Sequence, residues 1–581
     1  MKIKKQYLML MVLTLLLSFF VVDRIQANDD SQTETDNNTT EVGATLPEDH
    51  VFTTMNANGE IVEMDMSALE KQTQQEMRAA KRLRFSSTRA PKNGVVNFKT
   101  KSSSGYNTNY TEDGTNRSGY LNGYYGADGA FLGYNSNGSK VKFMQAGVIG
   151  WVNTSEVQIL DYDNYAQVKS INFYRSDNGI LNHYGTNNLS SSYYFMTNQV
   201  GVKQSYMNNN EVYYSYDGHY FYKTYAQMIA DYKAGHRKNS INPNNPYYNY
   251  YQYITHRTKT SFTAAQLNSY VASISNTNSK MYNQGNAFVS NQNIYGVNAA
   301  LSYGVAANES AWGQSSIAQT KNNLFGHAAY DSDPNASNGY SSPAFSIFYH
   351  AKRFVSIDYL DPKDYSGRYY GGHLGDKASG MNVKYASDPY WGEKAATVSW
   401  HLQKKYNVQD TQKYTLAIKA KGVNLNIRKD PNTASSAPYQ TGASGDYPFV
   451  VLEKVIGESI DGNNIWYKIQ SDPTLNGDRS QITQDIGNYD YAKFYGYVHA
   501  SYVSLVANSE NINDPVPEPI AGKGDVNGDQ KISAVDYVLV KNHILEIKAL
   551  SSQQQSSGDM NGDHKISAVD YVLIKNHILN Q

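Results

Sequence analysis

The chain has 581 residues, with 51 Lys and Arg against 52 Asp and Glu, and it contains no cysteine. This length exceeds what one ordinary hydrophobic core supports, so several domains are expected. The balanced charge argues against a nucleic-acid-binding protein, which needs a basic face to neutralise phosphates, and the lack of cysteine excludes disulfides, thiol catalysis and thiolate metal sites.

Residues 1–27 are predicted to be a secretory signal peptide. Lysines near the start precede an apolar run from Leu8 to Val22, and Ala27 is the expected cleavage position. A membrane anchor is the alternative, but the run is shorter than a bilayer-spanning helix usually needs. The sequence therefore predicts a secreted protein with no membrane segment after signal cleavage.

The central region is preceded by a spacer and two β-rich segments and is followed by a third β-rich segment. Residues 28–93 are predicted to be an acidic, disordered spacer with a short helix. Short β-rich runs separated by Gly, Asn and Ser turns then predict a small β module over 94–160 and a second one over 161–245. Residues 413–506 return to this pattern, and 507–522 form a proline-rich linker.

Residues 246–410 are predicted to form a mainly helical domain. Apolar residues recur at spacings of three and four from Ile294 to Val305 and give one apolar helix face, which leads into Glu309 and Trp312. A carboxylic acid in such surroundings tends to stay protonated and could donate to a leaving glycosidic oxygen. From residue type alone, a Glu at a helix end is more often a solvated surface residue.

The wider pattern resembles glycoside hydrolase family 73, the endo-β-N-acetylglucosaminidases that cleave peptidoglycan. The run E-S-A-W-G-x-S-x-I-A and the following K-N-N-x-F-G carry this resemblance, and the block N-V-K-Y-A-S-D-P-Y-W-G-E-K at 382–394 is similar to the cell-separating members. The resemblance implies a multidomain fold. An α-rich, lysozyme-like catalytic domain that needs no cofactor would be flanked by small all-β, SH3-like modules.

The same resemblance implies roles for individual residues. Glu309 is expected to be the general acid, and Asp388 the base for water or the stabiliser of the oxocarbenium-like transition state. The substrate's 2-acetamido oxygen could instead be the nucleophile, which would leave Asp388 an orienting role. The expected substrate-binding residues are Asp331, Tyr385, Trp312 and Trp391. Both tryptophans could equally pack in the core, and Glu393 is expected to be structural.

Two segments near the end of the chain, Gly524–Leu545 and Gly558–Leu579, differ at only three aligned positions. Positions 1, 3, 5, 9 and 12 of each carry side-chain oxygens at the spacing of a calcium loop, and position 7 offers its carbonyl. The predicted ligands of two calcium ions are Asp525, Asn527, Asp529, Lys531, Ser533 and Asp536, and Asp559, Asn561, Asp563, Lys565, Ser567 and Asp570. Position 6 is Gln530 or His564, where glycine is usual, a departure expected to weaken the turn.

This pair, at residues 523–581, resembles a type I dockerin, a module that binds cohesin domains on scaffolds or partner enzymes. In that family positions 10 and 11 of each loop recognise the partner. Here they are Ala534, Val535, Ala568 and Val569. Because the two pairs are identical, the resemblance implies binding in either of two orientations through an apolar contact.

The sequence as a whole therefore predicts a secreted, cell-wall-associated hydrolase of the Gram-positive type. It would cleave peptidoglycan or a related GlcNAc-containing glycan while held to a cohesin-bearing partner. The alternatives are a lytic transglycosylase or muramidase on a lysozyme-like fold, and a non-catalytic adaptor that only binds the cell wall.

Overall fold

The computed structural model describes residues 52–64, 69–75, 90–101, 106–275, 277–327, 339–419, 422–443, 445–483, 488–514 and 522–580. The predicted signal peptide, residues 28–51, 65–68 and 76–89 of the predicted spacer, Asp331 and residues 515–521 of the proline-rich linker lie outside these residues. Within the described ranges, no helix is both long and apolar enough to cross a membrane.

The first described segment is a β-hairpin instead of an acidic spacer. Strands β1 (Thr53–Met55) and β2 (Ile61–Glu63) pair antiparallel, and residues 69–75 are helical. The reason is apolar content that the composition of the whole segment hides. Phe52 is 1% exposed and Met55 is fully buried, so each has a hydrophobic core to enter.

Residues 94–161 form one antiparallel sheet of seven strands in the order β5-β4-β8-β7-β6-β3-β9. The strands are β3 (Gly94–Asn97), β4 (Asn107–Glu112), β5 (Ser118–Asn122), β6 (Asp128–Tyr134), β7 (Lys140–Gln145), β8 (Val148–Asn153) and β9 (Gln158–Asp161). Apolar side chains alternate along β7 and β8, so one face closes over a core of Val96, Phe98, Phe143 and Val152.

The next sheet has four strands in the order β12-β11-β10-β13 and is followed by one helix. Its elements are β10 (Phe173–Asp177), β11 (Ile180–Gly185), β12 (Met196–Val202), β13 (Val212–Tyr213) and α3 (Tyr225–Lys233). The Thr224 side chain caps α3 by accepting from the backbone N–H of Gln227. Tyrosines of this module pack against the first sheet, which joins the two cores.

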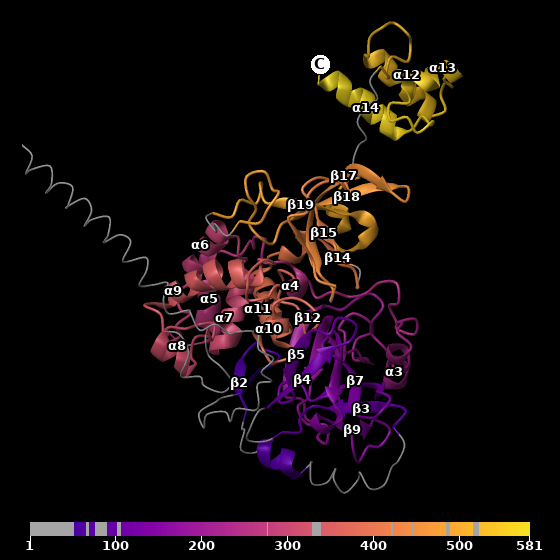
Figure 1. Ribbon diagram of the computed structural model, residues 1–581. Coiled ribbons are helices and arrows are strands. Elements are labelled where there is room, and N and C mark those ends of the chain that lie inside the picture. Colours follow the sequence, from indigo (N-terminus) through magenta and orange to yellow (C-terminus); the bar gives the residue numbers. More distant parts are fainter. Residues whose placement is uncertain are drawn as a thin grey trace, which may run out of the picture. The chain divides into compact units, whose positions relative to one another are not determined.

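A helical domain follows, as the spacing of its apolar residues predicts. It contains α4 (Tyr250–Tyr253), α5 (Ala264–Ile274), α6 (Gly285–Tyr295), α7 (Ala299–Ser310), α8 (Ser316–Lys321), α9 (Pro343–Tyr349), the π-helix η3 (His350–Tyr359), α10 (Asn382–Tyr385) and α11 (Trp391–Tyr406). Figure 1 shows these helices gathered in one group. Helices α7 and α11 pack so closely that a Cβ on Gly304 would lie 2.3 Å from the Ala395 carbonyl oxygen.

Residues 415–507 form a five-stranded antiparallel sheet in the order β19-β18-β17-β14-β20, with a separate two-stranded ladder. The five strands are β14 (Thr415–Lys419), β17 (Pro448–Ile460), β18 (Asn463–Gln470), β19 (Tyr495–His499) and β20 (Val503–Ala507). The ladder pairs β15 (Asn426–Ile427) with β16 (Tyr439–Gln440). Alternating apolar residues of these strands meet in one core.

The last module consists of three helices, α12 (Ala534–Ile544), α13 (Ser552–Gly558) and α14 (Ala568–Leu579). Helices α12 and α14 follow the two repeated loops and begin with the same capping box, formed by Ser533 with Asp536 and by Ser567 with Asp570. Tyr537 and Tyr571 stack at a ring distance of 4.2 Å, so equivalent positions of the two repeats face each other.

Candidate active site

Glu309 lies in the last turn of α7 and is half-buried. Nearly every other residue of this helix is buried, and the Asn298 side chain caps its start by accepting from the N–H groups of Ala300 and Leu301. The helix therefore runs through the domain core and brings one carboxyl group to the core's edge. The sequence predicts one apolar helix face from Ile294 to Val305, but this is wrong at its start: α6 ends at Tyr295, Ile294 is 39% exposed, and α7 begins at Ala299 after the left-handed Gly296.

The Glu309 carboxyl group has a specific hydrogen-bond donor. The indole N–H of Trp391, at the start of α11, donates to its Oε1. Its Oε2 faces Gly326, where a Cβ atom would lie only 3.2 Å away. The sequence block at 382–394 and the K-N-N-x-F-G run thus converge on the same carboxyl group, although each lies in a different part of the chain.

Aromatic side chains form the surroundings of this carboxyl group. Tyr385 stacks on Trp391 at a ring distance of 4.4 Å and donates from its hydroxyl to the Phe325 carbonyl oxygen at 3.0 Å. Tyr359, at the end of η3, lies 5.6 Å from the Tyr385 ring. Burial raises the pKa of Tyr385 well above its ordinary value, and the nearby Glu309 charge raises it further. The Tyr385 side chain is therefore uncharged at neutral pH.

Asp388 is committed to contacts within its own segment. It is 6% exposed and accepts from the Lys394 ammonium group at 2.6 Å and from the backbone N–H of Tyr390 at 2.8 Å. Lys394 is itself 2% exposed. The pair joins the loop before α11 to the first turn of that helix, where a carboxylate also complements the positive end of the helix.

Trp312 lies in the core and is 4% exposed. Its ring contacts Tyr270 and Tyr303, and its indole N–H donates to the Gly59 carbonyl oxygen at 3.0 Å. The geometry favours the packing interpretation of this tryptophan over sugar contact. Asp331, the remaining predicted substrate-binding residue, is outside the described residues.

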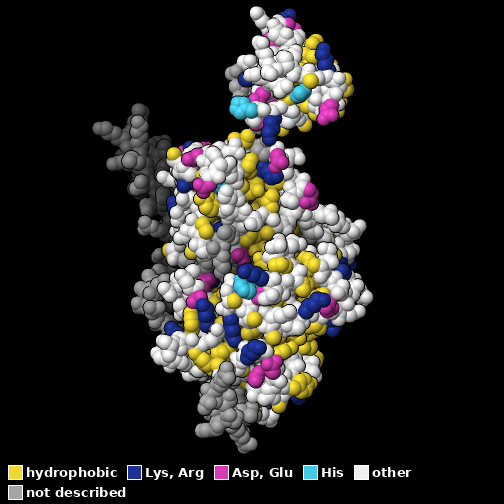
Figure 2. All heavy atoms as spheres, turned by 90° about the vertical axis from the view of Figure 1, so that its right-hand side faces the viewer, with side chains coloured by type: hydrophobic (Ala, Val, Ile, Leu, Met, Phe, Trp, Pro, Cys, Tyr) yellow, Lys and Arg dark blue, Asp and Glu magenta, His cyan; other side chains and the backbone are white. Residues whose placement is uncertain are grey.

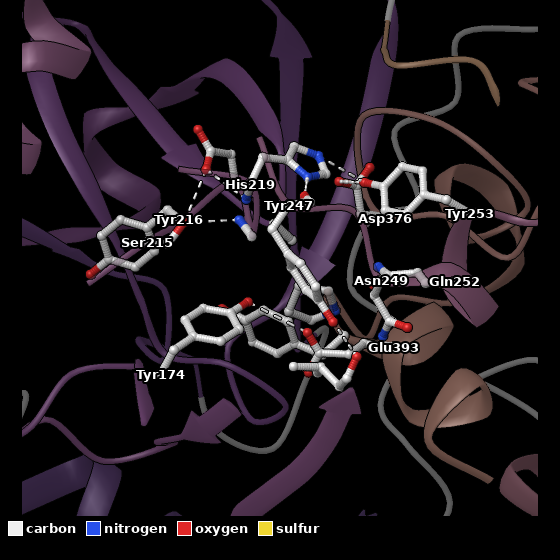
Figure 3. A pocket seen from close by; sticks show the side chains of 16 residues that line it. Tyr174, Ser215, Tyr216, His219, Tyr247, Asn249, Gln252, Tyr253, Asp376 and Glu393 are labelled. Atoms are coloured by element: carbon white, nitrogen blue, oxygen red, sulfur yellow. Dashed lines mark hydrogen bonds between the residues drawn. The ribbon is translucent and has the colours of Figure 1, made fainter. Parts of the chain in front are cut away.

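Glu393 connects the helical domain to the second β module, in agreement with a structural role. Its Oε1 accepts from His183 Nδ1 and from Asn198 Nδ2, both at 2.7 Å. A polar cavity beside it, which His219 and Asp376 also line, has a volume of about 30 Å³ (Figure 3). This volume holds about one or two water molecules and is too small for a sugar.

The third β module is fastened to the helical domain by a buried cation. Arg257 is 1% exposed, donates to the Asp472 carbonyl oxygen at 2.6 Å and lies over the Tyr489 ring at 4.3 Å. Asp472 in turn accepts from Tyr369, and burial raises its pKa to about 6. Local sequence spacing does not indicate the contact of Arg257 with Asp472, because the two residues are 215 positions apart.

In the repeated loops, carboxylates accept hydrogen bonds from their own backbone. Asp525 accepts from Gly528, Asp529 and Gln530, and Asp559 does the same in the second loop. Gln530 and His564 have φ values of 68° and 65°, so position 6 adopts the left-handed backbone that glycine usually supplies. The oxygen donors and the loop turns suit calcium. Among the described residues, no three Asp, Glu or His side chains lie close enough together to hold a metal ion by themselves.

Charged side chains are mixed on the face of the described residues in Figure 2. Lys and Arg alternate there with Asp and Glu, without one extended patch of either sign. This distribution agrees with the balanced composition and gives that face no continuous basic surface for a polyanion.

Two segments of the chain match known families. Residues 285–404 match the family described as mannosyl-glycoprotein endo-beta-N-acetylglucosaminidase, and residues 523–579 match the dockerin type I domain. The chain therefore contains a glucosaminidase domain, which includes Glu309 and Trp391, and a type I dockerin domain. Both resemblances stated from the sequence are confirmed.

Curated relatives match about half of the chain. Two proteins of Streptococcus pneumoniae, strains TIGR4 and R6, are each named putative endo-beta-N-acetylglucosaminidase and are 31% identical over 299 residues, 49% of this chain. The chain spans only 40% and 37% of their lengths. Among solved structures, S. aureus autolysin E in complex with a muropeptide is 22% identical over 27% of this chain and 74% of its own, with a TM-score of 0.23.

Proposed function

We propose that this chain is a secreted peptidoglycan hydrolase, an endo-β-N-acetylglucosaminidase that cleaves the β-1,4 bond after GlcNAc. The glucosaminidase family match over residues 285–404 supports the reaction class. The observation that carries the proposal is the setting of Glu309, whose carboxyl group ends a buried helix and is held by the Trp391 indole.

Glu309 would act as the general acid. The Trp391 N–H occupies Oε1, so the proton to be transferred resides on Oε2, on the side of Gly326. A protonated carboxyl group can donate from one oxygen while the other accepts, so the indole orients the acid without consuming its proton.

For the second catalytic group we favour the substrate over Asp388. Lys394 pairs with Asp388 at 2.6 Å, the Tyr390 N–H donates to its other oxygen, and the residue is 6% exposed, so both carboxylate oxygens are bound within their own segment. In the proposed reaction the 2-acetamido oxygen attacks the anomeric carbon as the glycosidic bond breaks, and Glu309 protonates the leaving oxygen. Water then opens the cyclic intermediate with Glu309 as base. Asp388 would orient the segment that carries Tyr385.

The other predicted residues take different places in this proposal. Tyr385 would support the sugar through its ring and keep the Phe325 carbonyl in place through its hydroxyl. Trp391 would hold the acid, and Trp312 would pack behind it. Asp331 remains a proposed substrate-binding carboxylate.

The dockerin would attach this enzyme to a cohesin-bearing partner outside the cell. Two calcium ions would be held by the predicted oxygen ligands of the repeated loops, which supply hard donors. Val535 is 54% exposed and Val569 is 36% exposed, so both predicted recognition pairs can offer an aliphatic contact. The resulting location is extracellular and associated with the cell wall.

The test is digestion of isolated peptidoglycan by the full chain, followed by mass spectrometry of the muropeptides. Glu309→Gln should lower the rate by about 10²- to 10⁴-fold, the usual contribution of a general acid, whereas the exposed Glu510→Gln should not change it. Products with reducing-end GlcNAc support the proposal. Products with anhydro-muramic acid or reducing-end MurNAc would assign a transglycosylase or a muramidase, and wall binding without cleavage would assign an adaptor.

A further inference from the structure

The backbone that follows Glu309 is held in an uncommon conformation. Ala311, Trp312 and Gly313 have φ values of 48°, 59° and 76°, so three consecutive residues are left-handed. For the two non-glycine residues this conformation is strained, so it persists only where surrounding contacts fix it. Ser310 supplies one such contact, since its hydroxyl accepts from the Gly313 N–H at 2.8 Å.

A second contact to this turn comes from far away in the sequence. The Trp312 indole N–H donates to the carbonyl oxygen of Gly59, at the tip of the hairpin β1–β2. The tip is itself rigid, because the Asn56 side chain accepts from the N–H groups of Asn58 and Glu60. Met55 of the same hairpin is fully buried in the core of the helical domain.

The same hairpin tip also touches α11. The tip packs directly on the His401 ring, because a Cβ on Gly59 would lie 2.8 Å from His401 Nδ1. Helix α11 begins with Trp391, which donates to Glu309. The hairpin thus contacts both the turn that follows the proposed acid and the helix that carries the donor to that acid.

We propose that the hairpin at residues 53–63 is a positioning element for Glu309. Through the Gly59 carbonyl and the contacts with His401, it fixes the left-handed turn after α7 and the α11 helix in register, and so sets the distance between the Glu309 carboxyl group and the Trp391 indole. The catalytic role of Glu309 rests on the proposed function, whereas the positioning of the carboxyl group against the indole does not.

The experiment uses two variants of the full chain. Gly59→Ala forces a Cβ into His401 at a residue whose φ is +79°, and Trp312→Phe removes the indole donor but keeps an aromatic ring. Gly138→Ala is the matched control, because Gly138 also has a positive φ, of +71°, but a Cβ there meets nothing within 4 Å. Both test variants should lower kcat by about ten- to hundredfold with little change in KM, as misplacement of a catalytic group does.

A second readout does not depend on activity. The chain has five tryptophans, so their indole N–H groups can be followed by ¹⁵N NMR, with Trp391→Phe to assign the Trp391 signal. Gly59→Ala and Trp312→Phe should displace this signal and move the midpoint of its pH titration, which reports Glu309, while Gly138→Ala leaves both unchanged. An unchanged Trp391 signal and titration in both variants would overturn the positioning role. If the unaltered chain releases no muropeptides but the two variants displace the Trp391 signal, the positioning role stands and only the proposed function is contradicted.

Discussion

Glu309 and Trp391 are separated by 82 positions in the sequence, and their hydrogen bond defines the candidate site. The other carboxyl oxygen, Oε2, lies on the side of Gly326. The φ of Gly326 is +64°, a backbone conformation in which a residue with an L side chain is strained. A side chain at this position would crowd Oε2, because its Cβ would lie 3.2 Å from that oxygen. The glycine of the K-N-N-x-F-G run therefore has a steric function, which is to leave room beside the Glu309 carboxyl group.

Gly326→Ala tests this steric role. The new Cβ would lie 3.2 Å from Glu309 Oε2, so we expect the muropeptide release rate to fall about tenfold. The left-handed backbone should also cost about 1–2 kcal/mol of stability. Gly114→Ala is the control, because its φ is +87° and its Cβ would meet nothing within 4 Å. An equal loss of rate in both variants would show that strain, and not crowding of the acid, is the cause.

The sequence could predict Glu309 but not its complete surroundings. One motif run contains Glu309 and a second block contains Tyr385 and Trp391, and the structure brings the two together. The use of each side chain depends on packing, which spacing does not encode. Trp312 enters the core because its helix ends in a left-handed turn, and Asp388 is bound by Lys394 only because α11 begins between them.

At the scale of elements, periodicity predicted a helical central domain but not the ends of its helices, because the apolar run from Ile294 to Val305 crosses the break between α6 and α7. It could not predict the hairpin β1–β2. Its two strands have three residues each, and the segment around them is polar and acidic. What orders it is a set of tertiary contacts by Phe52, Met55 and Gly59, which compensate for the weak local signal.

The ion pair at the start of α11 allows the second catalytic group to be tested. Asp388→Asn leaves the buried Lys394 without its counter-charge, and Lys394→Met does the converse, so each single change should cost about 3–5 kcal/mol in the free energy of unfolding. The double variant should regain most of this stability, because no unpaired charge remains.

Activity in the same cycle separates the two roles of Asp388. If Asp388 only orients the segment that carries Tyr385, the muropeptide release rate should recover in the double variant together with the stability. If Asp388 were the base, the double variant would be stable but would remain as inactive as Asp388→Asn. Thermal unfolding and muropeptide release are measured on the same samples.

At the scale of the whole molecule, side chains of the second and third β modules share buried polar contacts with the helical domain. Glu393 joins the second module through His183, and Arg257 joins the third through Asp472. Such contacts make the position of each module part of the folded state of the helical domain. The composition of these modules predicted sheets, but their attachment depends on single buried charges that no pattern reveals.

Calcium removal should divide the activities of the full chain. The carboxylates of Asp525 and Asp559 accept from their own loop N–H groups, so without the ion they keep the loops turned but cannot fix the predicted ligand geometry. Chelation should weaken binding to an isolated cohesin module more than about a hundredfold, because metal binding and module folding are coupled. Muropeptide release from isolated peptidoglycan should stay unchanged, since Glu309, Trp391 and Tyr385 involve no metal ligand in the proposed reaction.

Restoration of cohesin binding by added Ca²⁺ but not by an equal concentration of Mg²⁺ is the control, because the smaller ion demands octahedral geometry. A parallel loss of glycan cleavage on chelation would contradict this separation and place a calcium requirement within the catalytic part of the chain.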